Sequence, residues 1–167
     1  MKLLSLFSGI GAFEKALKNQ NIDFELVGYS EIDKPTAKAY SLIHDVSEDL
    51  NLGDIRKIQN PPKADLITYG FPCQDISVLG KQAGFKDSNG NPTRSGLFYE
   101  ALRIIKEVQP KIAIAENVKA LLHNKHKDDF NCVLKSLDDV GYVSFYRVLN
   151  AKDFNVPQNR ESDYCQH

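Results

Sequence analysis

The sequence has little cysteine, almost no net charge and no long apolar run. Its three cysteines, Cys73, Cys132 and Cys165, are odd in number and widely spaced, which indicates neither a disulfide framework nor a zinc site. A net charge of −1 does not support a generally basic nucleic-acid binder, although it leaves room for a local basic patch. No apolar stretch approaches the roughly 20 residues that span a bilayer, and the N-terminal run breaks at Ser8 without a leader's cleavage signal. We therefore expect a cytoplasmic protein whose thiols stay reduced.

Hydrophobic residues make up 42% of the 167 residues and charged residues 26%, which suits a packed core. Segments with the patterns of strands and helices alternate along the chain. We expect strands at 2–7, 24–32, 64–70, 111–118 and 142–151, and helices at 12–19, 33–44, 95–109 and 127–141. Asp33 would cap the second helix, with Pro35 in its first turn, Pro110 would end the third, and Gly141 would be the C-cap of the fourth. This alternation predicts an α/β layer fold with a mostly parallel sheet.

The segment "FSGIGAFE" (7–14) places two glycines where a strand turns into a helix. Such a turn lets a ligand approach the backbone and the helix N-terminus, although a simple tight turn needs glycine too. Glu31 ends the second strand about 20 residues later, where doubly wound folds bind ribose hydroxyls; taken alone, it fits an exposed surface acid. Asp54, in "LGDI", is a weaker candidate for an adenine amino group in the same cleft.

Two further candidates follow strands. Cys73, in "GFPCQDIS" (70–77), lies just past an apolar run, and Pro72 would stiffen the turn that presents its nucleophilic thiolate. A buried filler is the alternative for a single cysteine, and we assign that role to Cys132. Glu116, in "AENV" (115–118), ends another strand, where a dry pocket would raise the pKa of its carboxyl and make it a proton donor. A helix-capping or surface glutamate is the alternative.

These candidates lie at the ends of consecutive predicted strands. With the ordered segments "FSGIGAFE", "GFPCQDIS", "GKQAGFKDSNG", "RSGLFYE", "AENV" and "VPQNRE", the sequence resembles the cytosine-C5 DNA methyltransferases that use S-adenosylmethionine. The pairing of Pro-Cys-Gln with Glu-Asn-Val, in that order, is highly specific. The resemblance implies a doubly wound, Rossmann-like class I methyltransferase sheet. We expect a catalytic domain at 1–161 and a non-matching tail at 162–167, with the target-recognition domain absent.

The resemblance also implies the cofactor site, with S-adenosylhomocysteine as the product and no metal. Glu31 would bind the ribose hydroxyls, Ile32 would flank the adenine, and Asp54 and Ile55 would contact its ring. The residues that would line the pocket are those of the turn: Phe7, Ser8, Gly9, Ile10 and Gly11. Those that would lie near the methionine end are Gly70, Pro72 and Leu97.

The implied reaction begins when the Cys73 thiolate attacks C6 of a cytosine flipped out of duplex DNA. Glu116 would stabilise charge at N3, and Arg160 is the third catalytic candidate. The resemblance places five residues against the substrate: Gln74, Ser77, Asn117, Val118 and Gln158. The loop at 79–94 resembles the family's mobile active-site loop, and Lys81, Lys86 and Arg94 would touch phosphates; each also fits a solvated surface loop.

The sequence departs from the family after "VPQNRE". Ser162 replaces the second arginine of a Gln-x-Arg-x-Arg pattern, and that arginine, by resemblance, helps to hold the glutamate and the flipped base. In the family, the next strand inserts between the one ending at Glu116 and the one at 142–151. Because "SDYCQH" is short, polar and poorly patterned for a central strand, we expect the 142–151 strand to lack its partner and to expose a sheet edge.

The sequence therefore predicts a DNA (cytosine-5)-methyltransferase of a restriction-modification or phage system, acting on duplex DNA and away from membranes. A complementary chain could supply the target-recognition region. Two alternatives stay open. One is a tRNA cytosine-C5 methyltransferase. The other is a non-catalytic S-adenosylmethionine-binding fragment, or one subunit of a split enzyme.

Overall fold

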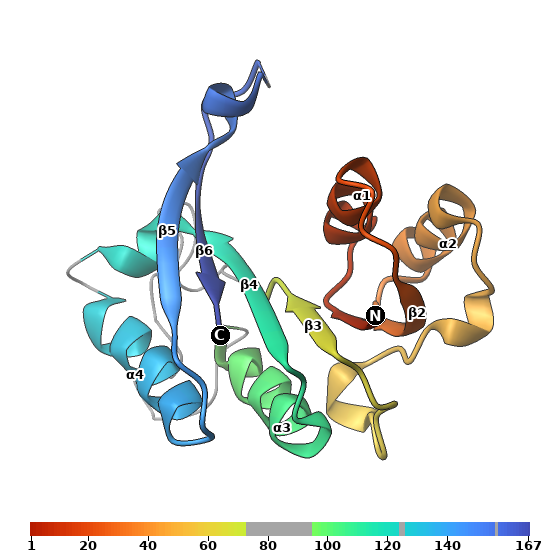
Figure 1. The fold of residues 1–167 in the computed structure, drawn as a ribbon, viewed down its shortest axis with the longest axis horizontal. Helices are drawn as coiled ribbons and strands as arrows, with labels where there is room; N and C mark the ends of the chain where they lie inside the picture. The colour runs from red at the N-terminus through yellow and green to blue at the C-terminus, as the bar shows by residue number, and fades with distance from the viewer. Residues whose placement is uncertain (73–94, 124–125, 156) are drawn as a thin grey trace. The chain divides into compact units, whose positions relative to one another are not determined.

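A computed structural model describes residues 1–72, 95–123, 126–155 and 157–167 (Figure 1). The chain divides into two compact units: residues 1–70 with 103–113, and residues 71–102 with 114–167. Strands and helices follow one another in the predicted order. None of the helices in the described part of the chain is long and apolar enough to cross a membrane.

The first unit contains three parallel strands. They are β1 (Lys2–Leu6), β2 (Glu25–Ser30) and β3 (Leu66–Tyr69), in the spatial order β2-β1-β3. The apolar run of β1 has no polar alternation because both faces of this strand are covered, and Leu3, Leu4 and Leu6 are almost completely buried.

Two helices belong wholly to the first unit, α1 (Ala12–Asn19) and α2 (Lys34–His44). Asp33 caps α2: its carboxylate accepts a hydrogen bond of 2.9 Å from the backbone amide of Thr36, and Pro35 occupies the first turn. The hydrogen bonds from Thr36 lower the pKa of Asp33. The predicted start and end of this helix are confirmed.

The helix α3 (Phe98–Val108) and the strand β4 (Ile112–Val118) each belong partly to both units. The helix begins later than the predicted residue 95 because 95–97 form a 3₁₀ turn. It ends just before Pro110, which lacks the amide hydrogen that a helix interior needs. Short 3₁₀ turns also occur at Glu48–Leu50, Ile55–Lys57 and Lys119–Leu122.

The second unit adds α4 (Lys127–Asp138), β5 (Phe145–Asn150) and β6 (Glu161–Gln166). The strands lie in the order β4-β6-β5, and β6 is antiparallel to both neighbours. The register places Glu116, Tyr164 and Arg147 directly opposite one another on the three strands. The prediction that the tail makes a poor central strand and leaves 142–151 without a partner is therefore wrong.

The composition of β6 explains this correction. Within β6, the small residues Ser162 and Cys165 are each 5% exposed, whereas Tyr164 and Gln166 are exposed. The covered positions thus carry compact side chains, and the larger polar side chains reach solvent. Two flanking strands also satisfy its backbone, so its polar composition does not prevent a central place.

The helix α4 packs on the sheet of the second unit through Phe130, whose ring meets Tyr146 of β5 edge to face, with centroids 5.0 Å apart. The helix ends at Asp138 and its C-cap is Asp139, so the predicted cap at Gly141 is two residues too late. Gly141 instead forms the turn beyond the cap, with a φ of 94° that favours glycine.

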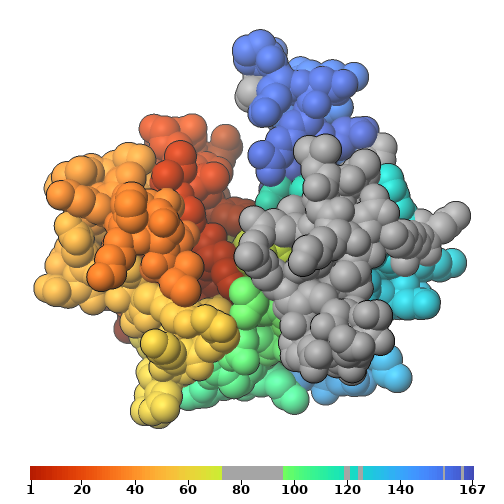
Figure 2. Space-filling view, turned by 180° about the vertical axis from the view of Figure 1, so that it is seen from behind, coloured from red at the N-terminus to blue at the C-terminus, as the bar shows by residue number. Residues whose placement is uncertain are grey.

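The β5–β6 hairpin ends in a turn that carries the short 3₁₀ helix η6 (Ala151–Phe154). Asn150 closes this turn: its amide donates to Asn159 at 2.8 Å, and its oxygen accepts from the backbone amide of Lys152. Figure 1 shows η6 at the tip of the hairpin, and in Figure 2 the blue atoms of this region stand out from the surface.

Candidate active site

The predicted glycine turn joins β1 to α1 in the first unit, and its backbone is left-handed at three positions. The φ angles are 53° at Phe7, 55° at Gly9 and 82° at Gly11. Glycine adopts such angles freely, but a bulky residue such as Phe7 does so only at a cost in free energy. The amide of Ser8 donates to the carbonyl of Ser30 at 3.0 Å and so ties the turn to the end of β2.

Glu31 follows β2 and holds the turn through its side chain. One carboxylate oxygen accepts a 3.0 Å hydrogen bond from the amide of Gly9, and the other accepts a 2.8 Å bond from the amide of Asp33. Each oxygen of a carboxylate can accept more than one hydrogen bond. Glu31 can therefore hold the turn and still accept bonds from ligand hydroxyls.

Asn51 links the end of β2 to the "LGDI" segment. Its side-chain oxygen accepts from the amides of Glu31 (3.1 Å) and Gly53 (3.0 Å), and its amide donates to the carbonyl of Glu31 (3.1 Å). Three predicted cofactor segments of the first unit are thus brought together. Asn51 is not among the predicted site residues, because its only sequence signal is an asparagine directly before "LGDI".

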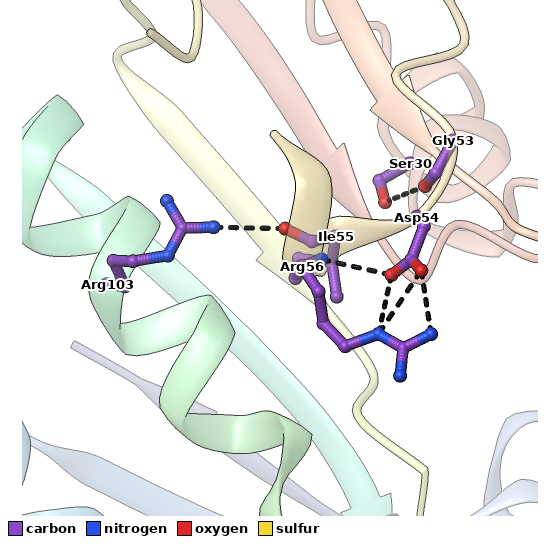
Figure 3. Close-up of polar contacts among 6 residues, drawn as sticks. All are labelled: Ser30, Gly53, Asp54, Ile55, Arg56 and Arg103. Atoms are coloured by element: carbon purple, nitrogen blue, oxygen red, sulfur yellow. Dashed lines mark hydrogen bonds and ion pairs between the residues drawn. The ribbon is translucent and has the colours of Figure 1, made fainter. Parts of the chain in front are cut away.

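Asp54 begins the 3₁₀ turn η2 (Ile55–Lys57) and is engaged by Arg56 (Figure 3). Its carboxylate accepts from the Arg56 amide at 3.0 Å, and from Nε and Nη2 at 2.9 and 2.7 Å. The hydrogen bond from the Arg56 side chain lowers the pKa of Asp54. An ionised carboxylate only accepts hydrogen bonds, which suits an amino donor such as that of adenine.

Arg103 of α3 holds the same turn from the other end. Its guanidinium donates to the carbonyls of Ile55 and Ile58 at 3.0 and 3.1 Å, and Figure 3 shows the bond to Ile55. Ser30 Oγ donates to the carbonyl of Gly53 at 2.7 Å. Ile55 is only 4% exposed and its carbonyl accepts from Arg103, so its contact with the adenine ring stays a prediction.

The glycine turn has the features of a ligand site. Ser8 Oγ is buried and has no hydrogen-bond partner among the described residues, which leaves a polar group for a ligand to satisfy. Ile10 and Ile32, at 60% and 66% exposure, present apolar surface from the same two segments. A molecule with a polar chain and an aromatic base, such as S-adenosylmethionine, fits this combination. Gly70, Pro72 and Leu97 are half-buried, and their place near its methionine end stays a prediction.

The end of β4 carries the predicted catalytic glutamate in the second unit. Nη2 of Arg160 lies 3.5 Å from Oε1 of Glu116, so the arginine before β6 pairs with this carboxylate. Tyr164 lies opposite Glu116 in the strand register. Burial raises the pKa of Tyr164 and the charge of Glu116 adds to this, while Arg160 opposes it.

Asn117, the next residue of β4, is 4% exposed and binds backbone groups. Its amide donates to the carbonyl of Phe71 at 3.2 Å, and its oxygen accepts from the amide of Val118 at 2.8 Å. The ring of Phe71 packs against Phe98, with centroids 5.6 Å apart. The bond thus fixes the backbone two residues before Cys73. Substrate contacts by Asn117, Val118 and the exposed Gln158 stay predictions.

Several predicted residues lie outside the described part of the chain: Cys73, Gln74, Ser77, Lys81, Lys86 and Arg94. Cys132 is half-buried in α4, and its sulfur lies 3.2 Å from the hydroxyl of Tyr99. This hydrogen bond raises the pKa of Tyr99 to about 12. Within the ranges that the structure describes, no group of three or more His, Cys, Asp or Glu side chains could hold a metal ion.

Residues 1–165 match the family model of the C-5 cytosine-specific DNA methylases, so the match runs past residue 161 into the predicted tail. The orphan methyltransferase M.SPRI of Bacillus phage SPR is 46% identical over 166 residues, which are 98% of this chain and 37% of that protein. The type II methyltransferase M2.ScrFI of Lactococcus lactis subsp. cremoris is 34% identical, over 99% of this chain and 60% of that protein. The chain thus spans less than two thirds of either relative.

Among solved structures, the Dnmt2 methyltransferase of S. pombe has the same fold, with a TM-score of 0.71 and 24% sequence identity. The match covers 99% of this chain and 48% of that one. The predicted fold class, a class I methyltransferase sheet, is confirmed.

Proposed function

The chain belongs to the C-5 cytosine-specific DNA methylase family, and from this premise we propose that it transfers a methyl group from S-adenosylmethionine to C5 of cytosine in DNA. The proposal rests on the side-chain contacts at the end of β4. There, Glu116 pairs with Arg160, and Asn117 fixes the backbone of Phe71, two residues before Cys73. A carboxylate and a nucleophile segment held on one strand end are what this chemistry requires.

Cytosine C5 is a weak nucleophile, so the reaction begins at C6. The thiolate of Cys73 adds to C6, and electron density moves into the ring, towards C5 and N3. The carboxyl group of Glu116, in its protonated form, donates a hydrogen bond to N3 and so stabilises the charge there, while Arg160 holds Glu116 in place. S-adenosylmethionine supplies the methyl group on its sulfonium. Loss of the C5 proton and elimination of Cys73 then restore the aromatic ring as 5-methylcytosine.

The first unit supplies the cofactor contacts in this proposal. Glu31 accepts bonds from the ribose hydroxyls, Asp54 accepts from the adenine amino group, and Ser8 Oγ binds a polar group of the ligand. The ordered bonds among these segments support the assignment, since a preformed site loses less conformational entropy on binding.

The substrate is DNA with the target cytosine flipped out of the duplex, because C5 and C6 cannot be reached within the base stack. The relatives come from a phage and a bacterium, and we place the reaction in the bacterial cytoplasm, in a phage or restriction-modification system. A complementary polypeptide that supplies target recognition is part of this proposal.

The test is transfer of labelled methyl groups from S-adenosylmethionine to duplex DNA of mixed sequence. Cys73→Ala should abolish transfer, and Cys132→Ala is the matched control that should retain it. Calorimetric binding of S-adenosylhomocysteine without transfer would instead support a cofactor-binding module that needs a second chain. Transfer to tRNA but not to DNA would support a tRNA methyltransferase.

A further inference from the structure

We propose that His44, in the last turn of α2, is a positioning residue for the cofactor turn Phe7–Gly11; this inference rests on the proposed function. His44 is 6% exposed, and its Nε2 lies 3.0 Å from the carbonyl oxygen of Ile10. A carbonyl oxygen only accepts hydrogen bonds, so Nε2 carries a proton and donates it to this bond.

The imidazole also fills the space beside Gly11. A Cβ atom on Gly11 would overlap the ring of His44, and the φ of 82° at Gly11 is left-handed. Gly11 is therefore needed both for its backbone conformation and for the close approach of His44. The histidine and the glycine form one packed contact under the turn.

Neighbouring aromatic rings hold His44 in place. The ring of Tyr40, one helical turn earlier, lies 4.7 Å from the imidazole and stacks on Tyr29 of β2 at 4.0 Å. The Tyr40 hydroxyl donates to Glu14 at 2.8 Å, and Glu14 lies buried in the first turn of α1. Burial and the adjacent Glu14 raise the pKa of Tyr40, so it stays a donor. The cluster thus joins β2, α2 and α1 beneath the turn.

The turn is consequently held by two side chains. Glu31 accepts from the amide of Gly9, and His44 donates to the carbonyl of Ile10. A turn with a left-handed Phe7 is costly to hold, and it persists only where surrounding contacts impose it. Without the His44 donor, the turn would populate other conformations. The affinity for the ligand would then fall in proportion to the fraction of molecules that stay in the binding conformation.

The test compares two side chains of nearly equal length in this 167-residue chain. His44→Gln keeps an N–H donor at the same reach, and His44→Met does not. By calorimetry, we expect S-adenosylhomocysteine to bind about three- to tenfold more weakly to the Met variant, and within about twofold of the parent to the Gln variant. Ser41→Ala is the control, because Ser41 lies on the same helix and its hydroxyl donates to the carbonyl of Lys38 within that helix. Its affinity should equal that of the parent.

Equal weakening by Gln and Met would overturn the inference, since it would show that packing alone matters. Unchanged affinity in the Met variant would overturn it as well. If His44→Met does not fold, NMR of the parent chain tests the inference instead. The Nε2–H signal of His44 should be protected from exchange and should shift on addition of S-adenosylhomocysteine. Absence of this signal, or a signal that does not shift, would refute the role. A parent chain that does not bind S-adenosylhomocysteine at all would overturn the proposed function, and this inference with it.

Discussion

The side-chain amide of Asn117 donates a 3.2 Å hydrogen bond to the carbonyl oxygen of Phe71, and so joins the end of β4 to the segment that leads to Cys73. Both partners are at most 4% exposed. The link is neutral and internal to the second unit, so it does not depend on a bound ligand. It explains in physical terms why an asparagine follows the glutamate.

Replacing Asn117 with Ala should therefore destabilise the fold. The carbonyl of Phe71 and the amide of Val118 both lose a buried partner, and we expect the free energy of unfolding to fall by about 1–3 kcal/mol. Urea unfolding measures this loss. Asn131→Ala, at an exposed position of α4, is the control and should change stability by less than about 0.5 kcal/mol. Equal effects of the two variants would contradict the role given to Asn117.

Ser8→Ala separates ligand binding from stability. Ser8 Oγ is buried without a partner among the described residues, so its removal should leave the stability of the ligand-free chain unchanged or slightly higher. Binding of S-adenosylhomocysteine should weaken about fivefold, because the ligand loses a hydrogen bond. Thermal unfolding and calorimetry together check this. A marked loss of stability would show that the hydroxyl has a partner within the protein.

Glu116→Gln should lower the rate of methyl transfer to DNA by about 100-fold or more, because an amide cannot transfer a proton to N3 and Arg160 loses its ionic partner. The binding of S-adenosylhomocysteine should not change. Glu25→Gln, at an exposed position of β2, is the matched control. Retained transfer in Glu116→Gln would show that another group stabilises the charge.

Arg103→Met tests the turn that carries Asp54. The carbonyls of Ile55 and Ile58 lose their donor, and we expect S-adenosylhomocysteine to bind about threefold to tenfold more weakly. Lys106→Met, at an exposed position of the same helix, makes the same change of charge without this contact. If both variants weaken binding equally, net charge rather than the position of the turn is responsible.

His167 makes stability depend on pH. Burial lowers its pKa from about 6.5 to about 4, and its Nδ1 lies 2.6 Å from Ser144 Oγ. The unfolded chain therefore binds this proton at a higher pH than the folded chain. Its stabilising contribution is complete above about pH 6.5 and is lost as the pH falls towards 4, by up to about 1 kcal/mol per pH unit.

The measurement for His167 is urea unfolding at several pH values between 4 and 7. His167→Gln should flatten the profile relative to the parent. His123→Gln, at an exposed histidine, should leave the profile unchanged. A parent and a His167→Gln variant with parallel profiles would contradict the lowered pKa.

Local patterns predicted most of the elements. The Asp33 cap and Pro35 mark the start of α2, and Pro110 marks the end of α3, because these residue types act on the backbone nearest to them. The glycine turn and Glu31 were also predicted, and the bond from Gly9 to Glu31 joins them. Such features can be predicted from a short segment of the sequence.

Contacts between distant segments could not be predicted in this way. Asn51, Arg103 and His44 hold the predicted cofactor segments, yet each bonds across at least 20 positions, which no periodicity records. The misjudged strand β6 has a related cause. Its polar composition predicts a poor central strand, but its central place depends on pairing with β4, a strand that is distant in the sequence.

The order of strands in the second unit has a consequence for synthesis on the ribosome. The strand β5 pairs with β6, and β6 pairs with β4, so β4 and β5 are joined through a strand that is translated after both. Until β6 leaves the exit tunnel, the nascent chain presents two strands whose facing edges are open, which favours association with other chains. A chain stalled before β6 has left the exit tunnel should therefore associate with a chaperone, and a chain extended by a linker that brings β6 out of the tunnel should not.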